Sequence, residues 1–148
     1  MKIIQAVTEI AAPVETVWAE LSDVSAYAEW NPFITSFDGA LVVGARVGVR
    51  IAPPGGRPMR FRPTITAVDE NSRLEWLGRL AMPGIFDGRH SFNLEAVGVD
   101  QTRLTQSERF SGLLVPLTRT TLEKTRAGFE AMNEALRLRA ENSFATTR

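Results

Sequence analysis

The chain has 148 residues, of which 44% are hydrophobic, and its 17 Lys and Arg balance 17 Asp and Glu. This size and composition predict one folded domain and exclude a disordered chain, and the lack of a basic excess argues against nucleic-acid binding. Because there is no Cys and only one His, disulfides, thiol nucleophiles and multi-His metal sites within one chain are excluded as well.

The N-terminal part of the sequence predicts one strand followed by two short helices. Residues Lys2 to Ala11 alternate in polarity, which is typical of a strand, and Pro13 suits the first turn of the helix that follows. A second short helix should end near Trp30, because Asn31 precedes Pro32 and is therefore held in extended geometry.

From Phe33 to Gly112 the pattern changes to short segments of alternating polarity, separated by turns rich in Gly, Pro and Asp. Such alternation, with one polar face, is typical of an antiparallel sheet that has one wet side. Counting the first strand, we expect about seven strands in a curved sheet. The alternation places His90 on the buried face of its strand, and Gln106 and Glu108 on the buried face of theirs.

The last segment predicts one long helix. From Leu114 to about Asn142 only Gly128 interrupts a run in which apolar residues recur every three or four positions. The concave face of the sheet is the one large surface against which this apolar stripe can pack. The tail, from Ser143 to Arg148, is expected to fray. The order of elements therefore predicts an α+β fold in which a curved antiparallel sheet grips the C-terminal helix.

Five segments carry a pattern that covers nearly the whole chain: residues 10–18 (IAAPVETVW), 21–23 (LSD), 27–34 (YAEWNPFI), 90–95 (HSFNLE) and 108–116 (ERFSGLLVP). In this order and spacing they resemble the START-like, or Bet v 1-like (SRPBCC), superfamily, and within it the polyketide cyclase/dehydrase and lipid-transport group. The resemblance implies one START-like ligand-binding domain over residues 1–148, a helix-grip fold, and a hydrophobic cavity between the sheet and the long helix.

Most side chains expected to line that cavity are aromatic or thioether groups, which suit a flat or ring-containing ligand. They are Trp30, Phe33, Met59, Phe61, Trp76, Phe92, Phe110, Phe129 and Met132, and Asn31, His90, Gln106 and Glu108 add polar groups. For each apolar residue the alternative is plain core packing. For Asn31 the alternative is a role in the turn before the proline.

Glu108 and His90 are the candidates for acid–base chemistry. A carboxylate that faces the interior is costly unless it is paired, hydrogen-bonded or protonated, and a meander would bring it beside the only His. The alternative for both residues is a structural pair without chemistry. The sequence has no nucleophile elbow, Walker loop or dinucleotide fingerprint. Proton transfer is the enzyme mechanism left open, and the resemblance suggests an aldol-type cyclisation or a dehydration.

Three functions stay open at this point. The chain could bind a small hydrophobic molecule, lipid-like or polyketide-like, in its cavity; it could be a polyketide cyclase or dehydratase that uses Glu108 and His90; or it could be an interaction domain similar to chaperone regulators. We expect no cofactor, metal, nucleic acid or membrane span, and exposed strand edges leave a homodimer open. The polar N-terminus does not resemble a signal peptide, so a cytoplasmic location is expected.

Overall fold

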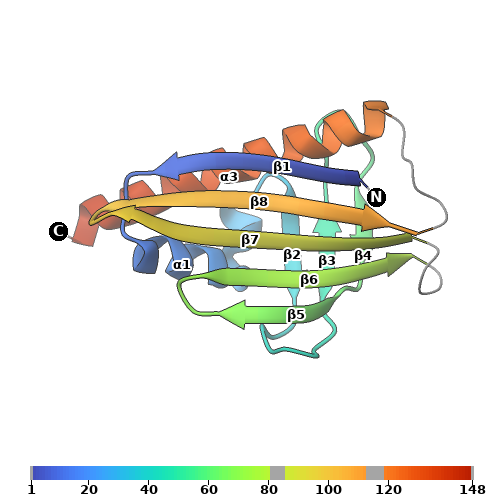
Figure 1. Ribbon diagram of the computed structural model, residues 1–148, viewed down its shortest axis with the longest axis horizontal. Helices are drawn as coiled ribbons and strands as arrows, with labels where there is room; N and C mark the ends of the chain where they lie inside the picture. Colours follow the sequence, from blue (N-terminus) through green and yellow to red (C-terminus); the bar gives the residue numbers. More distant parts are fainter. Residues whose placement is uncertain (1, 81–85, 113–118, 148) are drawn as a thin grey trace.

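The computed structural model describes residues 2–80, 86–112 and 119–147, and its strands curve around one long helix (Figure 1). In chain order the elements are β1 (Lys2–Ile10), α1 (Val14–Ser22), η1 (Val24–Ala26), α2 (Tyr27–Trp30), β2 (Ile34–Asp38), β3 (Gly48–Ile51), β4 (Met59–Phe61), β5 (Thr64–Asp69), β6 (Arg73–Leu80), β7 (Phe86–Gly98), β8 (Gln101–Ser111) and α3 (Arg119–Thr147). Among the described helices, none combines the length and apolar character needed to cross a membrane.

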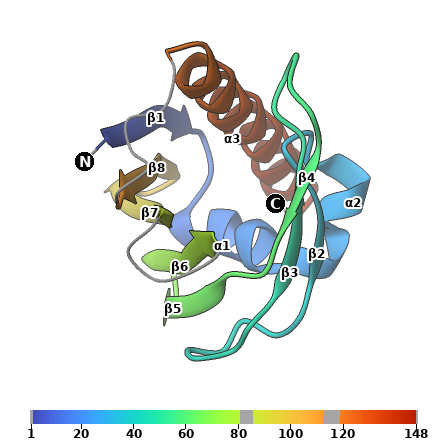
Figure 2. The ribbon, with the colours of Figure 1, turned by 90° about the vertical axis from the view of Figure 1, so that its right-hand side faces the viewer.

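The strands form two antiparallel sheets. A five-stranded sheet has the order β1-β8-β7-β6-β5, and a three-stranded sheet has the order β2-β3-β4. Arg46, in the loop before β3, forms a β-bridge with Thr64 on β5, where the two sheets adjoin. Seen end-on, α3 lies between β1 on one side and the three-stranded sheet on the other (Figure 2). The predicted α+β architecture, with strands wrapped around the C-terminal helix, is therefore confirmed.

The number of strands differs slightly from the prediction. The described residues contain eight strands in two sheets, whereas the sequence predicts about seven in one sheet. The difference lies around Pro63, where β4 ends at Phe61 and β5 begins at Thr64 instead of forming one continuous segment. A proline has no N–H for a strand ladder, so the chain leaves one sheet here and enters the other.

α3 supplies the apolar stripe that covers the concave side of the large sheet. Phe129, Met132 and Leu136 are fully buried and follow one another at spacings of three and four residues. The helix continues to Thr147, so the tail expected to fray is helical as far as that residue. The expected helix start at Leu114 lies outside the described residues.

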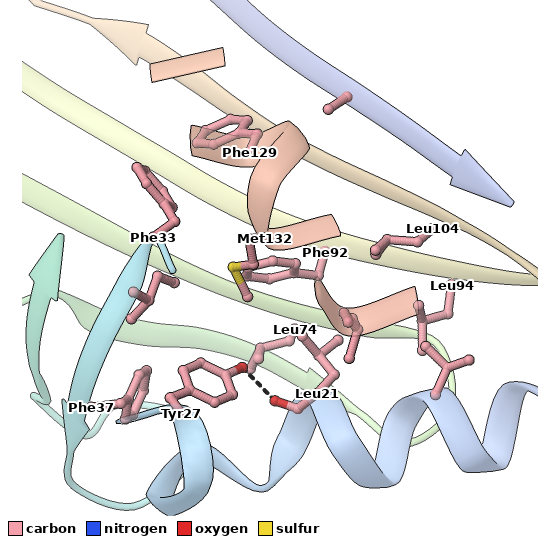
Figure 3. Packing of buried hydrophobic residues seen from close by; sticks show 14 of the residues in the cluster. Leu21, Tyr27, Phe33, Phe37, Leu74, Phe92, Leu94, Leu104, Phe129 and Met132 are labelled. Atoms are coloured by element: carbon pink, nitrogen blue, oxygen red, sulfur yellow. Dashed lines mark hydrogen bonds between the residues drawn. The ribbon is translucent and has the colours of Figure 1, made fainter. Parts of the chain in front are cut away.

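Aromatic side chains from the short helices, the strands and α3 meet in the core (Figure 3). Phe33 packs against Phe129 with 5.5 Å between the ring centroids. A Cβ atom at Gly128 would stand 2.3 Å from Cδ1 of Phe33, so only glycine leaves room for the ring at this point of α3. The buried Tyr27 hydroxyl donates to the carbonyl oxygen of Leu21, and burial raises the pKa of this hydroxyl.

One carboxylate on β6 gathers three donors. Glu75 accepts hydrogen bonds from Arg73, Arg89 and Thr66, the last two at 2.8 Å. Burial by itself raises the pKa of Glu75, but the hydrogen bonds from the two arginines and the threonine outweigh it and leave that pKa below its usual range. Glu75 is therefore held as a carboxylate by one donor on its own strand and by two on the adjacent strands β5 and β7.

Candidate functional site

Strand register brings together three of the polar residues singled out in the sequence. His90 on β7 lies opposite Glu108 on β8, and Phe92 lies opposite Gln106 on the same pair of strands. Because these positions alternate on one face, all of these side chains project toward α3. His90 and Gln106 are buried, whereas the Glu108 side chain keeps 17% of its surface exposed.

These side chains form a continuous hydrogen-bonded series, here called the polar chain, that runs from Glu108 to β1. Oε1 of Glu108 lies 2.8 Å from Nδ1 of His90, and Nε2 of His90 lies 2.9 Å from Oε1 of Gln106. Nε2 of Gln106 then donates to Oδ1 of Asn133 at 2.7 Å. Nδ2 of Asn133 donates to the carbonyl oxygen of Ala6 at 3.2 Å. The polar chain thus connects β7, β8, α3 and β1.

The direction of the polar chain is fixed by two backbone carbonyls, because a carbonyl oxygen only accepts hydrogen bonds. Ala6 must accept from the amide nitrogen of Asn133, which leaves Oδ1 of Asn133 as an acceptor. Gln106 must then donate through Nε2, which also lies 3.3 Å from the carbonyl oxygen of Phe129. Oε1 of Gln106 therefore accepts from His90, and Nε2 of His90 carries a proton.

The other ring nitrogen of His90 shares its proton with Glu108. Since Nε2 is already a donor, Nδ1 either donates to a carboxylate or accepts from a carboxylic acid. Moving this one proton between Nδ1 and Oε1 converts an ion pair into a neutral pair. Oε2 of Glu108 accepts no hydrogen bond within the described part of the chain. Glu108 is therefore the end of the polar chain through which a proton can be exchanged with a bound molecule.

Three aromatic rings surround the His90 imidazole. Trp76 stacks on it with 5.0 Å between centroids and an interplanar angle of 25°. Phe92 and Phe129 each lie 4.9 Å away, at tilted angles. These contacts fix the plane of the imidazole, so Nδ1 stays directed at Glu108 and Nε2 at Gln106.

Gly88 has no side chain that could cover Oε2, the second carboxylate oxygen of Glu108. It lies on β7 opposite Phe110, and a Cβ atom there would stand 3.1 Å from Oε2 of Glu108. Any larger residue at this position would press on the carboxylate. The glycine therefore leaves space beside the one polar group of the site that solvent reaches.

The other predicted lining residues divide between the interior and the outside. Trp76, Phe92, Phe110, Phe129, Met132 and Phe33 are buried in the core. Met59 is exposed, so its expected place in the cavity wall is corrected: it lies in the short edge strand β4 and faces water. Phe61, also on β4, packs against the core but lines an outer pocket.

Asn31 and Trp30 lie at the end of α2. Oδ1 of Asn31 accepts hydrogen bonds from the backbone N–H groups of Phe33 and Ile34, at 3.0 and 2.8 Å. This is the turn role that the sequence left as an alternative to ligand binding. Trp30 is half-buried, and the guanidinium carbon of Arg139 lies 6.0 Å from the centroid of its ring.

The space between the large sheet and α3 is occupied by side chains. Phe33, Phe129 and Met132 are fully buried there. Two pockets formed by described residues, of about 370 and 510 Å³, are lined by β2, β3, β4, β5, β6 and the loop before β3. Neither pocket is lined by α3 or by the polar chain, so these pockets do not supply the internal cavity that the resemblance implies.

Asn133 is the member of the polar chain that the sequence reasoning missed. It is fully buried on α3 directly after Met132 and four residues after Phe129. A polar residue in the middle of a buried helical stripe needs a partner, and that rule was available from the sequence. What the sequence could not supply is that β1, more than a hundred residues earlier, provides the partner.

The similarity to known proteins covers nearly the whole chain. The family model described as polyketide cyclase / dehydrase and lipid transport matches residues 1–141. A START superfamily protein from Mycobacterium smegmatis has 20% identity and a TM-score of 0.73, with 99% of each chain covered. Protein MLL2253 from Mesorhizobium loti has 21% identity and the same TM-score, with 96% of this chain and 98% of that one covered.

A third solved structure, DynU16, is a protein of the dynemicin biosynthetic locus. It shares 20% identity with this chain at a TM-score of 0.71, and the match covers 97% of this chain and 49% of DynU16. No curated protein sequence matches the chain. At these identities the solved structures establish the helix-grip fold.

Proposed function

The chain belongs to the polyketide cyclase/dehydrase and lipid-transport family, and on this premise we propose that it binds a small hydrophobic, ring-containing molecule between the large sheet and α3. One observation carries the proposal: the polar chain is embedded in an aromatic interior. An apolar core of the same shape would avoid the desolvation of Glu108 and His90, so the retention of these groups favours a role in recognition.

The surroundings of Glu108 suggest what the ligand looks like. Flat aromatic side chains such as Trp76 and Phe129 offer faces for a ring system, and Glu108 offers one polar contact. A molecule with an apolar body and one hydroxyl or carbonyl group matches this arrangement. The place of DynU16 in a biosynthetic locus is in keeping with a biosynthetic intermediate of this kind.

Phe33 is the side chain that a ligand would displace. It comes from the segment between α2 and β2, and its ring occupies the interior next to Gly128 and Phe129. Moving the ring aside would open space beside the polar chain without unfolding the sheet. We therefore assign Phe33 as the residue that closes the binding site when no ligand is bound.

Two measurements test this function. Native mass spectrometry of freshly purified protein should show a bound small molecule in addition to the chain mass. In addition, Phe33→Ala should bind the fluorescent apolar probe anilinonaphthalene sulfonate more tightly than the wild type does. Leu94→Ala is the control, because it opens a core position on β7 away from the polar chain. An equal gain in the two variants, with no ligand in the wild type, would contradict the proposal.

A second function, acid–base catalysis, is favoured by the direction of the polar chain. The fixed proton on Nε2 of His90 leaves Nδ1 and Glu108 to exchange a single proton, which is the arrangement that a general base needs. In this proposal the Glu108 carboxylate removes a proton from the bound molecule, and the His90 imidazolium beside it stabilises the negative charge that is left on that molecule. An aldol-type cyclisation or a dehydration would use such a step.

The Kemp elimination of a nitrobenzisoxazole tests for this base, because an apolar site with a carboxylate takes the C–H proton while the N–O bond breaks. Glu108→Gln should lower the rate by at least about tenfold, since a positioned base contributes on the order of 10²–10⁴. Glu95→Gln is the matched control, because Glu95 is 69% exposed on the same sheet. Equal rates in wild type and Glu108→Gln would contradict the catalytic proposal and leave the ligand-binding proposal unaffected.

A further inference from the structure

An apolar turn projects from the molecule between β2 and β3. Its two valines, Val42 and Val43, have 59% and 62% of their surface exposed. The turn is held by hydrogen bonds from Val42 N to Ala40 O and from Ala45 N to Val42 O, both 2.9 Å long. The loop extends below β5 in Figure 1. These two residues, here called the valine tip, are thus presented to solvent by a well-defined turn.

The valine tip is fastened to the large sheet by its C-terminal end. The N–H of Gly44 donates to the carbonyl oxygen of Ile65 at 2.8 Å, and the N–H of Ile65 donates to the carbonyl oxygen of Ala45 at 2.9 Å. The next residue, Arg46, forms a bridge with Thr64. The tip therefore stands beside β5, and its position is set by backbone contacts with that strand.

Two pockets lie along the same junction of the sheets. The first, of about 370 Å³, is lined by Arg46, Arg62, Thr64, Thr66, Leu77 and Arg79. The second, of about 510 Å³, has Asp38, Arg46, Arg60 and Arg62 among its lining residues. Arg46 and Arg62 line both pockets, so the pockets are neighbours on this surface. We call Arg46, Arg60, Arg62 and Arg79 the arginine cluster.

Three of the four arginines in the arginine cluster have no carboxylate partner among the described residues. Within the described ranges, Arg46, Arg60 and Arg62 form no ion pair with a carboxylate, while Arg79 has Asp87 at 3.7 Å. Among the described residues that line the two pockets, Asp38 supplies the one carboxylate. A guanidinium binds a phosphate group through two parallel hydrogen bonds, so these pockets suit phosphate oxygens.

We propose that this side of the molecule docks on a membrane of anionic phospholipid. The valine tip would enter the boundary between headgroups and acyl chains, and the arginine cluster would bind the lipid phosphates beside it. A soluble phosphate compound would account for the arginines but not for the exposed valines next to them. Apolar insertion and basic attraction together are what peripheral membrane binding requires. The surface lies outside the core, so the proposal does not depend on the proposed ligand.

The chain offers a matched control for the valine tip. Val99, in the turn between β7 and β8, is 92% exposed, more than either valine of the tip. The pockets and the arginine cluster do not include any residue of that turn. If exposed valine alone produced membrane binding, Val99 would contribute as much as Val42 and Val43 do.

Vesicle co-sedimentation tests the proposal with the full chain. Wild type should pellet with vesicles of equal parts phosphatidylcholine and phosphatidylglycerol, less so at high salt, and not with phosphatidylcholine alone. Arg46→Gln with Arg62→Gln should lower the partition coefficient by roughly 25-fold, about fivefold per arginine. Val42→Ser with Val43→Ser should lower it by about tenfold or more, and Val99→Ser should leave it unchanged. Circular dichroism confirms that each variant is folded.

Three results would overturn the proposal. The first is that wild type does not pellet with the anionic vesicles at low salt. The second is that either double variant pellets as well as the wild type does. The third is that glycerol phosphate in solution, at millimolar concentration, binds the arginine cluster and the valine variant still pellets fully, because the site would then recognise a free anion.

Discussion

Gly128→Ala sets two effects of known size against each other. In the interior of a helix, replacing glycine by alanine should stabilise the fold by about 1 kcal/mol, because glycine has the lower helix propensity. Here the new Cβ atom would stand 2.3 Å from Cδ1 and 2.5 Å from Cε1 of Phe33. The ring would have to withdraw by about 1 Å to reach ordinary contact distance. Phe33 is fully buried against Phe129, so it cannot move without cost.

The steric effect should be the larger one. Inserting a methyl group into a packed core costs about 1–3 kcal/mol and the propensity gain is about 1 kcal/mol, so Gly128→Ala should lower the free energy of unfolding by up to about 2 kcal/mol. For a chain of this size that corresponds to a drop in Tm of up to about 6 °C. Urea unfolding, followed by tryptophan fluorescence, measures the change directly. Ala131→Gly in the same helix calibrates the propensity effect alone, with an expected loss of about 1 kcal/mol.

A double-mutant cycle separates the two effects. In a Phe33→Ala background the ring is gone, so Gly128→Ala should now stabilise the protein by about 1 kcal/mol. The sign of the change therefore reverses between the two backgrounds. If Gly128→Ala stabilises wild type and the Phe33→Ala variant equally, the ring does not rest on α3. In that case Phe33 could not be the residue that closes the proposed binding site.

Three further predictions concern buried polar groups. Asn133→Leu removes the hydrogen bonds from Gln106 to Asn133 and from Asn133 to the carbonyl oxygen of Ala6, and should lower the free energy of unfolding by about 1–3 kcal/mol in urea; no change would mean that these bonds add nothing to stability. Nitrogen NMR of the labelled protein should show a proton on Nε2 of His90 at every pH at which the protein is folded, and an unprotonated Nε2 would reverse the direction deduced for the polar chain. The pKa of Glu75 is lowered in the folded state, so its stabilising effect is present above the usual carboxyl pKa and is lost as the pH falls through the lowered value. Glu75→Gln should therefore lower the free energy of unfolding near pH 7 and make that free energy less dependent on pH in the acid range. The measurement is the urea midpoint of wild type and Glu75→Gln at pH 7 and at about pH 3. A midpoint that changes equally between the two pH values in wild type and variant would contradict this role of Glu75.

The local spacing of polar and apolar residues was sufficient to predict the architecture and the part of the site that lies on the strands. The alternation of β7 and β8 predicts that His90, Gln106 and Glu108 share the buried face, since side-chain direction in a strand follows from position alone. The apolar spacing in α3 likewise predicts its buried stripe. Both are properties of neighbours in sequence, and both are visible without knowing how the elements pack.

Contacts between distant elements account for what the sequence did not predict. The partner of Asn133 is a backbone carbonyl of β1, and no residue type signals which carbonyl a buried amide will meet. Phe33 fills the interior because Gly128 admits its ring, and that fit depends on the depth at which α3 lies. Met59 was wrongly expected in the interior because its side chain is apolar. Pro63 interrupts the strand pattern and leaves β4 as a short edge strand, on which Met59 is exposed.

The carbonyl of Ala6 has a consequence for engineering this scaffold. A peptide group cannot exchange its acceptor for a donor, so its orientation dictates that of Asn133, then of Gln106, and finally which nitrogen of His90 is available to Glu108. Replacing Glu108 alone therefore leaves the direction of the polar chain unchanged. A designer who wants the opposite tautomer at the imidazole must begin three hydrogen bonds away, at the backbone of β1.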